Sequence, residues 1–194
     1  MERLYFNPPV LAIVTGTSGS GKTTLSSGLY DGNGNRISPG VMHTIHAIYI
    51  NKDMISDGFS KERSGEFYEQ VVRRGTYNAI DNIARCNLML GNSIWIDANY
   101  STEVQNEGWA SRYRILAEET NSMLKLLRCV APEDIIKRRL EERSYERDRG
   151  KLEDWTGFLK REPIHVPVPF NGIEIDTSNS LEECVKRALK FLQE

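Results

Sequence analysis

The chain has 194 residues, of which 39% are hydrophobic and 27% charged, with a formal net charge of −2. This length suits one domain with a full hydrophobic core, and the composition excludes a disordered protein. The charge argues against non-specific coating of nucleic acid, and no apolar run reaches the ~18 residues of a membrane span. Three widely spaced cysteines and no secretion signal suit a reducing cytoplasm. We therefore expect a single cytoplasmic domain over residues 1–194.

The first half of the chain begins with a buried strand. The continuous apolar run Val10–Val14 is typical of a strand covered on both faces, and a glycine-rich turn leads from it into a helix over 22–30. Turn-forming residues over 31–40 predict a surface loop or hairpin, and a second strand is expected over 44–50. A helix over 61–90 follows, with Gly75 as a possible break and these inward side chains: Phe67, Val71, Ile80, Ile83, Ala84 and Leu88.

Strands and helices continue to alternate to the end of the chain. The remaining strands are predicted over 94–97, 124–130 and 173–176, and the remaining helices over 102–121, from 132, near 155 and over 180–192. Such alternation favours a three-layer α/β fold, with a parallel sheet of about five strands and helices on both faces. Ligands bind such sheets beyond the carboxyl ends of the strands. Asp53, Asp97 and the glycine-rich turn all lie at these ends, so we expect the functional site there.

The glycine-rich turn carries the strongest motif. Its sequence GTSGSGKTT matches G-x-x-x-x-G-K-[ST] between a strand and a helix, and the predicted nucleotide-binding residues are Gly16, Thr17, Ser18, Gly19, Ser20, Gly21, Lys22, Thr23 and Thr24. Glycines let backbone N–H groups point at phosphate oxygens, and the helix adds its positive end. Lys22 is expected to bridge the β- and γ-phosphates of a nucleoside triphosphate, and Thr23 to bind Mg²⁺. A loop that merely connects strand to helix is the weaker interpretation.

Two strand-end carboxylates suggest catalysis beside this loop. Asp53 follows the second strand, where it could accept the proton of an attacking hydroxyl; the alternative is a cap of the next turn or helix. Asp97 ends the strand Ile94–Ile96, which is typical of a carboxylate near Mg²⁺, although it could instead bind nearby backbone amides. Asn99 is a weaker candidate for positioning a phosphate acceptor.

A charged segment near the carboxyl third predicts a helical lid over about 138–160. Arg139, Arg143 and Arg147 would share one helical face, and guanidinium groups closing over the phosphates would neutralise charge in the transition state. We expect Arg143 and Arg147 to be the catalytic pair. The alternative is a solvated helix with ion pairs between residues four apart.

Together these motifs resemble the small P-loop kinases, which include the polynucleotide kinase domain, zeta-toxin-like kinases and related proteins of the AAA ATPase type. In chain order the matching segments are Gly16–Thr24, Asn51–Asp53, Ile96–Asn99, Arg112, Arg139–Arg143 and Ile175–Thr177. The resemblance implies transfer of phosphate from ATP, with Mg²⁺, to a hydroxyl. It implies Asp53 as the general base, Asp97 as the strand-end acid, and Arg143 and Arg147 as lid arginines.

The acceptor stays open at this point. Polynucleotide kinases carry an arginine three residues after the base, and Ser56 stands there in this chain. A polynucleotide end, a hydroxymethylated base in DNA and a small-molecule alcohol are the candidate acceptors, with Asn99 and Arg112 as weak acceptor contacts. The competing function is an ATPase switch without an acceptor; a GTPase is disfavoured because no N-K-x-D motif is found.

Overall fold

A computed structural model describes residues 3–60 and 65–194 of the chain. Its main sheet has five parallel strands in the order β4-β5-β1-β6-β7. The strands are β1 (Val10–Thr15), β4 (Ala47–Asn51), β5 (Ser93–Asp97), β6 (Met123–Val130) and β7 (Ile173–Asp176). This confirms the predicted α/β fold with a parallel sheet of about five strands.

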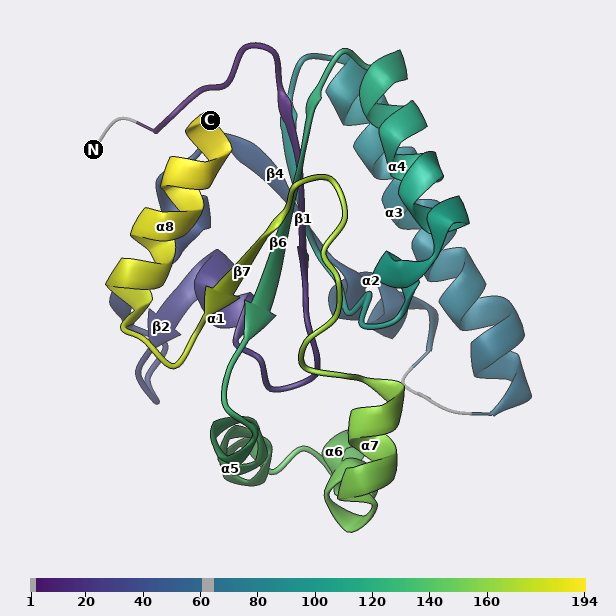
Figure 1. The fold of residues 1–194 in the computed structure, drawn as a ribbon, viewed down its shortest axis with the longest axis vertical. Helices are drawn as coiled ribbons and strands as arrows, with labels where there is room; N and C mark the ends of the chain where they lie inside the picture. The colour runs from purple at the N-terminus through teal and green to yellow at the C-terminus, as the bar shows by residue number, and fades with distance from the viewer. Residues whose placement is uncertain (1–2, 61–64) are drawn as a thin grey trace.

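Helices cover both faces of the sheet, as Figure 1 shows. One face carries α1 (Lys22–Ser27) and α8 (Leu181–Gln193), and the other carries α3 (Arg74–Met89) and α4 (Glu107–Glu119). The alternating side chains of β1 divide between two cores, because Leu11 and Ile13 pack in the α3 and α4 core while Val10, Ala12 and Val14 pack in the other. Burial on both faces explains why β1 is apolar at every position except its last.

The strand register brings the functional ends of three strands level with one another. Asp97 of β5 pairs with Val14 of β1 on one side and with Asn51 of β4 on the other. The loop after β1 and the helix α2 (Lys52–Phe59), which follows β4 directly, therefore begin on either side of Asp97. This arrangement places the three predicted strand-end features at one edge of the sheet.

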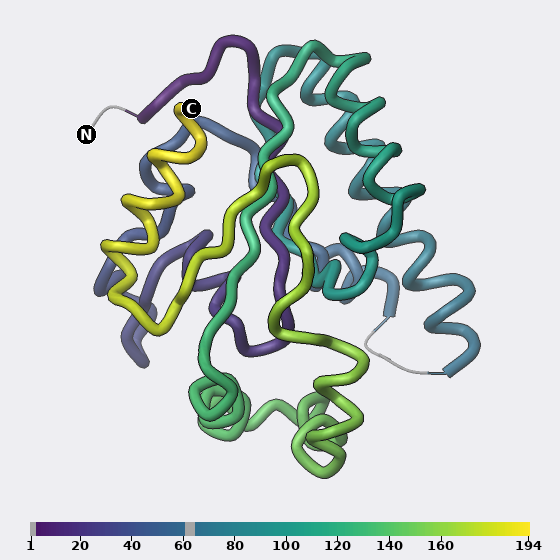
Figure 2. The backbone as a smooth tube through the Cα atoms, in the orientation of Figure 1, coloured from purple at the N-terminus to yellow at the C-terminus, as the bar shows by residue number. Residues whose placement is uncertain are grey.

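Three helices form a lid beyond the carboxyl ends of the strands (Figure 1). They are α5 (Glu133–Arg143), α6 (Glu146–Glu153) and α7 (Trp155–Arg161), and Ile136, Leu140 and Phe158 make their own small core. Figure 2 shows that the chain enters the lid from β6 and returns from α7 through a long extended segment toward β7. The predicted helical lid is confirmed, and it begins a few residues before the expected start.

The first helix is shorter than predicted. It ends at Ser27, and Gly28–Tyr30 form strand β2, which pairs antiparallel with β3 (Arg36–Pro39). Gly28 has φ +102°, and a Cβ there would lie 2.3 Å from the Ser38 carbonyl oxygen, so the two strands meet where only glycine fits. The predicted loop or hairpin over 31–40 is therefore a hairpin that begins within the expected helix.

The helix predicted over 61–90 differs in its buried face. Residues 61–64 lie outside the described residues, and the segment Tyr68–Arg73 is a π-helix that runs into α3 without a break at Gly75. Phe67, Val71 and Ile83 were expected inside and are 57%, 54% and 39% exposed. The buried side chains follow a four-residue spacing instead: Tyr68, Val72, Thr76, Ile80, Ala84 and Leu88. The π-helix has more residues per turn than an α-helix, so the inward positions over Tyr68–Arg73 differ from those expected at 3.6 residues per turn.

Two further boundaries were wrong. The second strand begins at Ala47 because Val41–His43 form a short 3₁₀ helix. The helix expected over 102–121 starts at Glu107, where the Asn106 side chain accepts a hydrogen bond from the Trp109 N–H at 3.0 Å and caps it. Within the described part of the chain, no helix is both long and apolar enough to cross a membrane.

Candidate phosphoryl-transfer site

The phosphate loop joins β1 to α1 and is shaped by close backbone contacts. Gly16 has φ +137°, and a Cβ there would lie 2.3 Å from the Cys129 carbonyl oxygen of β6, so no side chain fits. The Lys22 ammonium donates hydrogen bonds to the Gly16 and Thr17 carbonyl oxygens at 2.8 and 3.0 Å. Burial lowers the pKa of Lys22, and the nearby Asp97 carboxylate partly opposes this. The loop is thus folded around the ammonium of Lys22, a half-buried residue.

Two cavities meet at this loop, and Lys22 and Thr23 line both. The smaller, of about 420 Å³, is bordered by α1, β2 and the segment after β7, with Leu29 and Leu181 among its apolar side chains. The larger, of about 580 Å³, lies toward β4 and β5 and is lined mainly by charged and polar side chains. The mixed apolar and polar lining of the smaller cavity suits a nucleoside, and the larger one suits a polar acceptor.

Asp97 lies at the centre of a hydrogen-bond network between these elements. Its Oδ2 atom accepts hydrogen bonds from Thr23 Oγ1 at 3.0 Å and from the Tyr49 hydroxyl at 2.8 Å, and Asn51 donates to Tyr49 at 3.0 Å. Burial raises the pKa of Asp97, while the Lys22 ammonium works in the opposite direction. The predicted pair Thr23 and Asp97 is therefore in direct contact.

The same two side chains fit a magnesium ion. Both offer hard oxygen ligands, and they lie next to the phosphate loop. Among the residues that the structure describes, no group of three or more His, Cys, Asp or Glu could hold a metal by itself.

Asp53 lies in the first turn of α2 and faces the larger cavity. Its side chain is about half exposed (47%) and accepts a hydrogen bond from Arg147 Nη1 at 3.0 Å, with the Lys52 ammonium at 3.5 Å. The N-cap of α2 is Asn51, whose side chain accepts from the Met54 N–H. The alternative interpretation of Asp53 as a cap is therefore wrong. Asp53, Asp97 and Lys22 line one cavity.

The lid arginines approach the phosphate loop from two helices. Helix α5 ends at Arg143 because Ser144 adopts a left-handed conformation, with φ 51°, and α6 begins at Glu146. The expected common helical face of Arg139, Arg143 and Arg147 is therefore wrong. Arg143 and Arg147 meet again across the break, because both guanidinium groups lie 5.2 Å from the centre of the Tyr145 ring.

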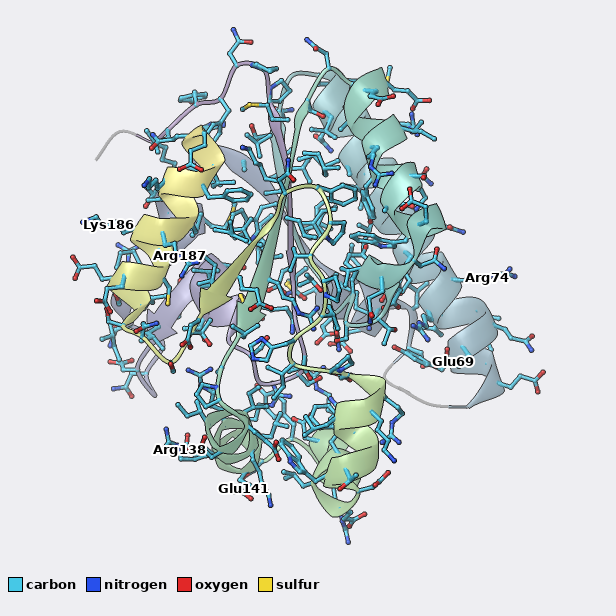
Figure 3. The ribbon with its side chains drawn as sticks, in the orientation of Figure 1. Glu69, Arg74, Arg138, Glu141, Lys186 and Arg187 are labelled. Atoms are coloured by element: carbon cyan, nitrogen blue, oxygen red, sulfur yellow. The ribbon has the colours of Figure 1, made fainter. Side chains whose placement is uncertain are left out.

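Each arginine then has its own partner. Arg143 lines both cavities, and its Nε donates to the buried Asp148 at 2.6 Å. Arg139 donates to the Thr177 carbonyl oxygen at 2.7 Å and lines only the smaller cavity, which we call the nucleoside-side cavity. Arg138 is exposed and pairs with Glu142 at 3.8 Å, and Figure 3 shows it pointing away from the sheet. The solvated ion-pair interpretation therefore holds for Arg138 but not for Arg143.

Sequence reasoning missed a carboxylate that contacts the phosphate loop directly. Glu162, just after α7, accepts hydrogen bonds at one oxygen from the Ser18 N–H (2.8 Å), Asn99 Nδ2 (2.8 Å) and Thr17 Oγ1 (3.3 Å). Burial alone would raise its pKa, but Lys151 and the Ser18 N–H outweigh burial and the pKa is lowered. No local motif marks Glu162, because its partners are far away in the sequence.

The part of the larger cavity formed by Lys52, Tyr68, Glu69, Arg73 and Glu103, here called the acceptor-side wall, carries both positively and negatively charged side chains. Arg73 lies between Glu69 and Glu103, at 2.8 and 2.7 Å, and the Lys52 ammonium donates to the Tyr68 hydroxyl at 3.2 Å. Asn99, a predicted acceptor contact, lines this cavity. Arg112 does not. It pairs with Asp81 at 3.1 Å and lines a separate hollow beside Trp109.

Comparisons with known proteins show the family and the fold of the chain. A family model described as an AAA domain matches residues 11–161, which is more than half of the chain. No curated protein matches the chain in sequence.

Solved structures share the fold over nearly the whole chain. A protein from Chloroflexus aurantiacus j-10-fl, assigned as a kinase, has a TM-score of 0.69 and 20% identity over 96% of this chain and 100% of its own. A sugar kinase from Janibacter sp. HTCC2649 has a TM-score of 0.64 and 18% identity, over 96% of this chain and 95% of its own. The APS kinase CysC of Mycobacterium tuberculosis, in complex with AMPPNP and APS, has a TM-score of 0.57 and 16% identity, over 96% of this chain and 99% of its own. The fold is that of small P-loop kinases.

Proposed function

This chain belongs to the AAA domain family, and on that premise we propose that it is an ATP-dependent kinase acting on a hydroxyl group of a small polar molecule. The observation that carries the proposal is the meeting of Lys22, Asp53 and Asp97 in one cavity beside the phosphate loop. ATP is the proposed donor, which the AMPPNP bound to the structurally similar APS kinase supports.

The proposed reaction is an in-line displacement at the γ-phosphorus. Asp53 accepts the proton of the acceptor hydroxyl while the oxygen of that hydroxyl bonds to the γ-phosphorus. The bond between the γ-phosphorus and the bridging oxygen of ADP breaks. Lys22, held at the mouth of the loop, attracts the phosphate oxygens. Arg143 and Arg147, brought together on the Tyr145 ring, neutralise charge on the transferring group.

Thr23 and Asp97 are the residues that would hold Mg²⁺ in this proposal. When bound, the ion would neutralise phosphate charge and polarise the phosphoryl group. In the protein itself, Tyr49 orients the Asp97 carboxylate through its 2.8 Å hydrogen bond, and Thr23 donates to the same oxygen at 3.0 Å. The orientation of Asp97 is therefore set before any substrate arrives.

The acceptor-side wall favours a small polar acceptor over nucleic acid. On that wall Glu69 and Glu103 flank Arg73, and carboxylates at this place would repel a polyphosphate backbone. Ion-paired carboxylates, amides and tyrosines are the groups that hydrogen-bond to a polyhydroxy compound. The sugar kinase among the similar structures supports this choice. An end or a modified base of DNA is the alternative acceptor.

The test is transfer of label from γ-labelled ATP to sugars, polyols, nucleosides, antibiotics and oligonucleotides with hydroxymethylated bases. We expect labelling of a small polyhydroxy compound, and an Asp53→Asn variant that binds ATP normally but transfers at least about 10²-fold more slowly. Asp134→Asn, an exposed carboxylate at the start of α5, is the matched control and should transfer normally.

Three other results would change the proposal. ATP hydrolysis that proceeds at full rate without any acceptor would favour the ATPase switch. Labelling of oligonucleotides alone would move the acceptor to nucleic acid. Normal transfer by Asp53→Asn would remove Asp53 from the role of base. The single-domain organisation and the cytoplasmic location both stay predictions.

A further inference from the structure

We infer that Glu162 is a specificity-determining residue, which occupies the terminal-phosphate end of the phosphate loop and weakens binding of a nucleoside triphosphate relative to a diphosphate. The inference rests on the proposed function, because it assumes that the loop binds a nucleotide. It concerns a residue outside the phosphate-loop motif, contributed by the lid, and it assigns that residue a role in choosing between two ligands.

The first observation is that Glu162 already uses a donor of the phosphate loop. One carboxylate oxygen accepts the Ser18 N–H at 2.8 Å, the Asn99 amide at 2.8 Å and the Thr17 hydroxyl at 3.3 Å. Backbone N–H groups of such loops are the donors that hold phosphate oxygens. A carboxylate oxygen in this position makes the contacts that an oxygen of a phosphate would make.

The second observation is where along the loop this contact lies. Gly21 and Thr24 line only the nucleoside-side cavity, whereas Ser18 and Glu162 line only the acceptor-side cavity. Gly19, Lys22 and Thr23 lie between them and line both cavities. A polyphosphate that extends from the nucleoside side therefore passes Lys22 and ends toward Ser18, so the third phosphate comes nearest to Glu162.

The third observation is that the Glu162 backbone is held on both sides. Its own N–H donates to the Phe158 carbonyl oxygen at 2.8 Å at the end of α7. The fully buried Arg128 of β6 donates from Nε to the Ile164 carbonyl oxygen at 3.0 Å and from Nη2 to that of Pro163. The backbone on both sides of Glu162 is thus anchored, and a rotation of the side chain is the smallest movement that takes the carboxylate off the loop.

These contacts imply competition between the Glu162 carboxylate and the third phosphate of a nucleoside triphosphate. A γ-phosphate and the Glu162 carboxylate would compete for the same donors and repel each other, while a diphosphate would end farther from Glu162. Lys151 moderates the repulsion, because its ammonium donates to Ser18 Oγ at 2.8 Å on the same side. Productive triphosphate binding then requires the Glu162 carboxylate to move off the Ser18 N–H. The site would be ready for phosphoryl transfer only after this movement.

A purely structural role would look different. If Glu162 only fastens the lid to the loop, then Glu162→Gln, which keeps a hydrogen-bond acceptor of the same size, leaves the ratio of the two affinities unchanged. If Glu162 instead assists triphosphate binding, the same change weakens AMPPNP binding. The sign of the change in affinity ratio therefore separates the three roles.

The experiment compares the dissociation constants of Mg-AMPPNP and Mg-ADP by calorimetry for the wild-type chain, Glu162→Gln and Glu153→Gln. Glu153 is a matched control, because it is an exposed lid carboxylate that pairs with Arg149 outside the two cavities. We expect Glu162→Gln to strengthen AMPPNP binding about tenfold relative to ADP binding, and Glu153→Gln to leave the ratio as in the wild type. Thermal unfolding of each variant establishes that it is folded.

The failures are distinguishable. A ratio that is unchanged or reversed in a folded Glu162→Gln variant would overturn the inference while leaving the proposed function intact. Absence of binding of both nucleotides to the folded wild-type chain and to the folded variant would overturn the proposed function, and the inference with it.

Discussion

A single buried carboxylate shows how function and stability oppose each other in this site. Asp97 is almost fully buried, and its Oδ2 accepts from Thr23 and Tyr49. Because burial raises its pKa on balance, the folded protein favours the protonated form more than the unfolded chain does. The free energy of unfolding therefore falls as the pH rises through and above the ordinary Asp range. The ionised group costs stability that its proposed role with Mg²⁺ would justify.

We predict that Asp97→Asn raises the stability of the nucleotide-free protein and weakens its binding of Mg-AMPPNP. The amide oxygen can still accept both hydroxyl hydrogen bonds. The desolvated carboxylate charge is gone, and this gain has to exceed the loss of the charge that partly offsets the burial of the Lys22 ammonium. Without ligands at neutral pH, the thermal midpoint should rise by about 2–4 °C, or about 1 kcal/mol for a chain of this size. Addition of Mg-AMPPNP should raise the midpoint of the wild type more than that of the variant. A variant that is less stable at neutral pH would contradict this account.

At the scale of elements, the break between two lid helices creates a feature that neither helix has alone. Ser144 ends α5 with a left-handed residue, and Tyr145 then precedes α6. The Tyr145 ring is approached by Arg143 from one helix and by Arg147 from the next, each at 5.2 Å. An uninterrupted helix would have placed these arginines one turn apart on a common stripe. The break instead places both arginines against one aromatic ring, and both arginines line the larger cavity.

We predict that Tyr145→Ala weakens binding of Mg-AMPPNP about three- to tenfold, because each cation–π contact at an exposed site is worth about 0.5–1 kcal/mol. Tyr145→Phe keeps the ring and should bind as the wild type does. The measurement is the dissociation constant of both variants by calorimetry, with circular dichroism as a check on helix content. Equal loss in both variants would mean that the hydroxyl, rather than the ring, matters.

The π-helix is the element for which periodicity was misleading. A period of 3.6 residues per turn predicts that the apolar Phe67 and Val71 are buried, whereas Tyr68 and Val72 are the buried side chains. Tyr68 also carries the hydroxyl that receives the Lys52 hydrogen bond in the larger cavity. A widened turn thus brings a polar ring to the site, and single-sequence patterns do not reveal such a turn.

At the scale of the whole molecule, the predictable part follows from local rules. The apolar run Val10–Val14, the loop motif after it and the strand-end Asp97 are each readable within a few residues, and a parallel sheet brings strand ends together. The contacts made by Glu162 and Lys151 were not predictable, because they depend on how the lid packs over the loop. Local sequence therefore predicted one wall of the site, while the lid side required the three-dimensional structure.

The central claim is that the loop around Lys22 holds the phosphates of a nucleotide beside Asp53 and Asp97. The most direct measurement is the affinity for Mg-AMPPNP of the wild-type chain, of Lys22→Ala and of Lys186→Ala, an exposed lysine on α8 that Figure 3 shows pointing outward. We predict that Lys22→Ala binds at least about 100-fold more weakly, given charge-assisted hydrogen bonds worth about 1.5–3 kcal/mol, while Lys186→Ala binds normally. Equal affinity in all three proteins would contradict the account.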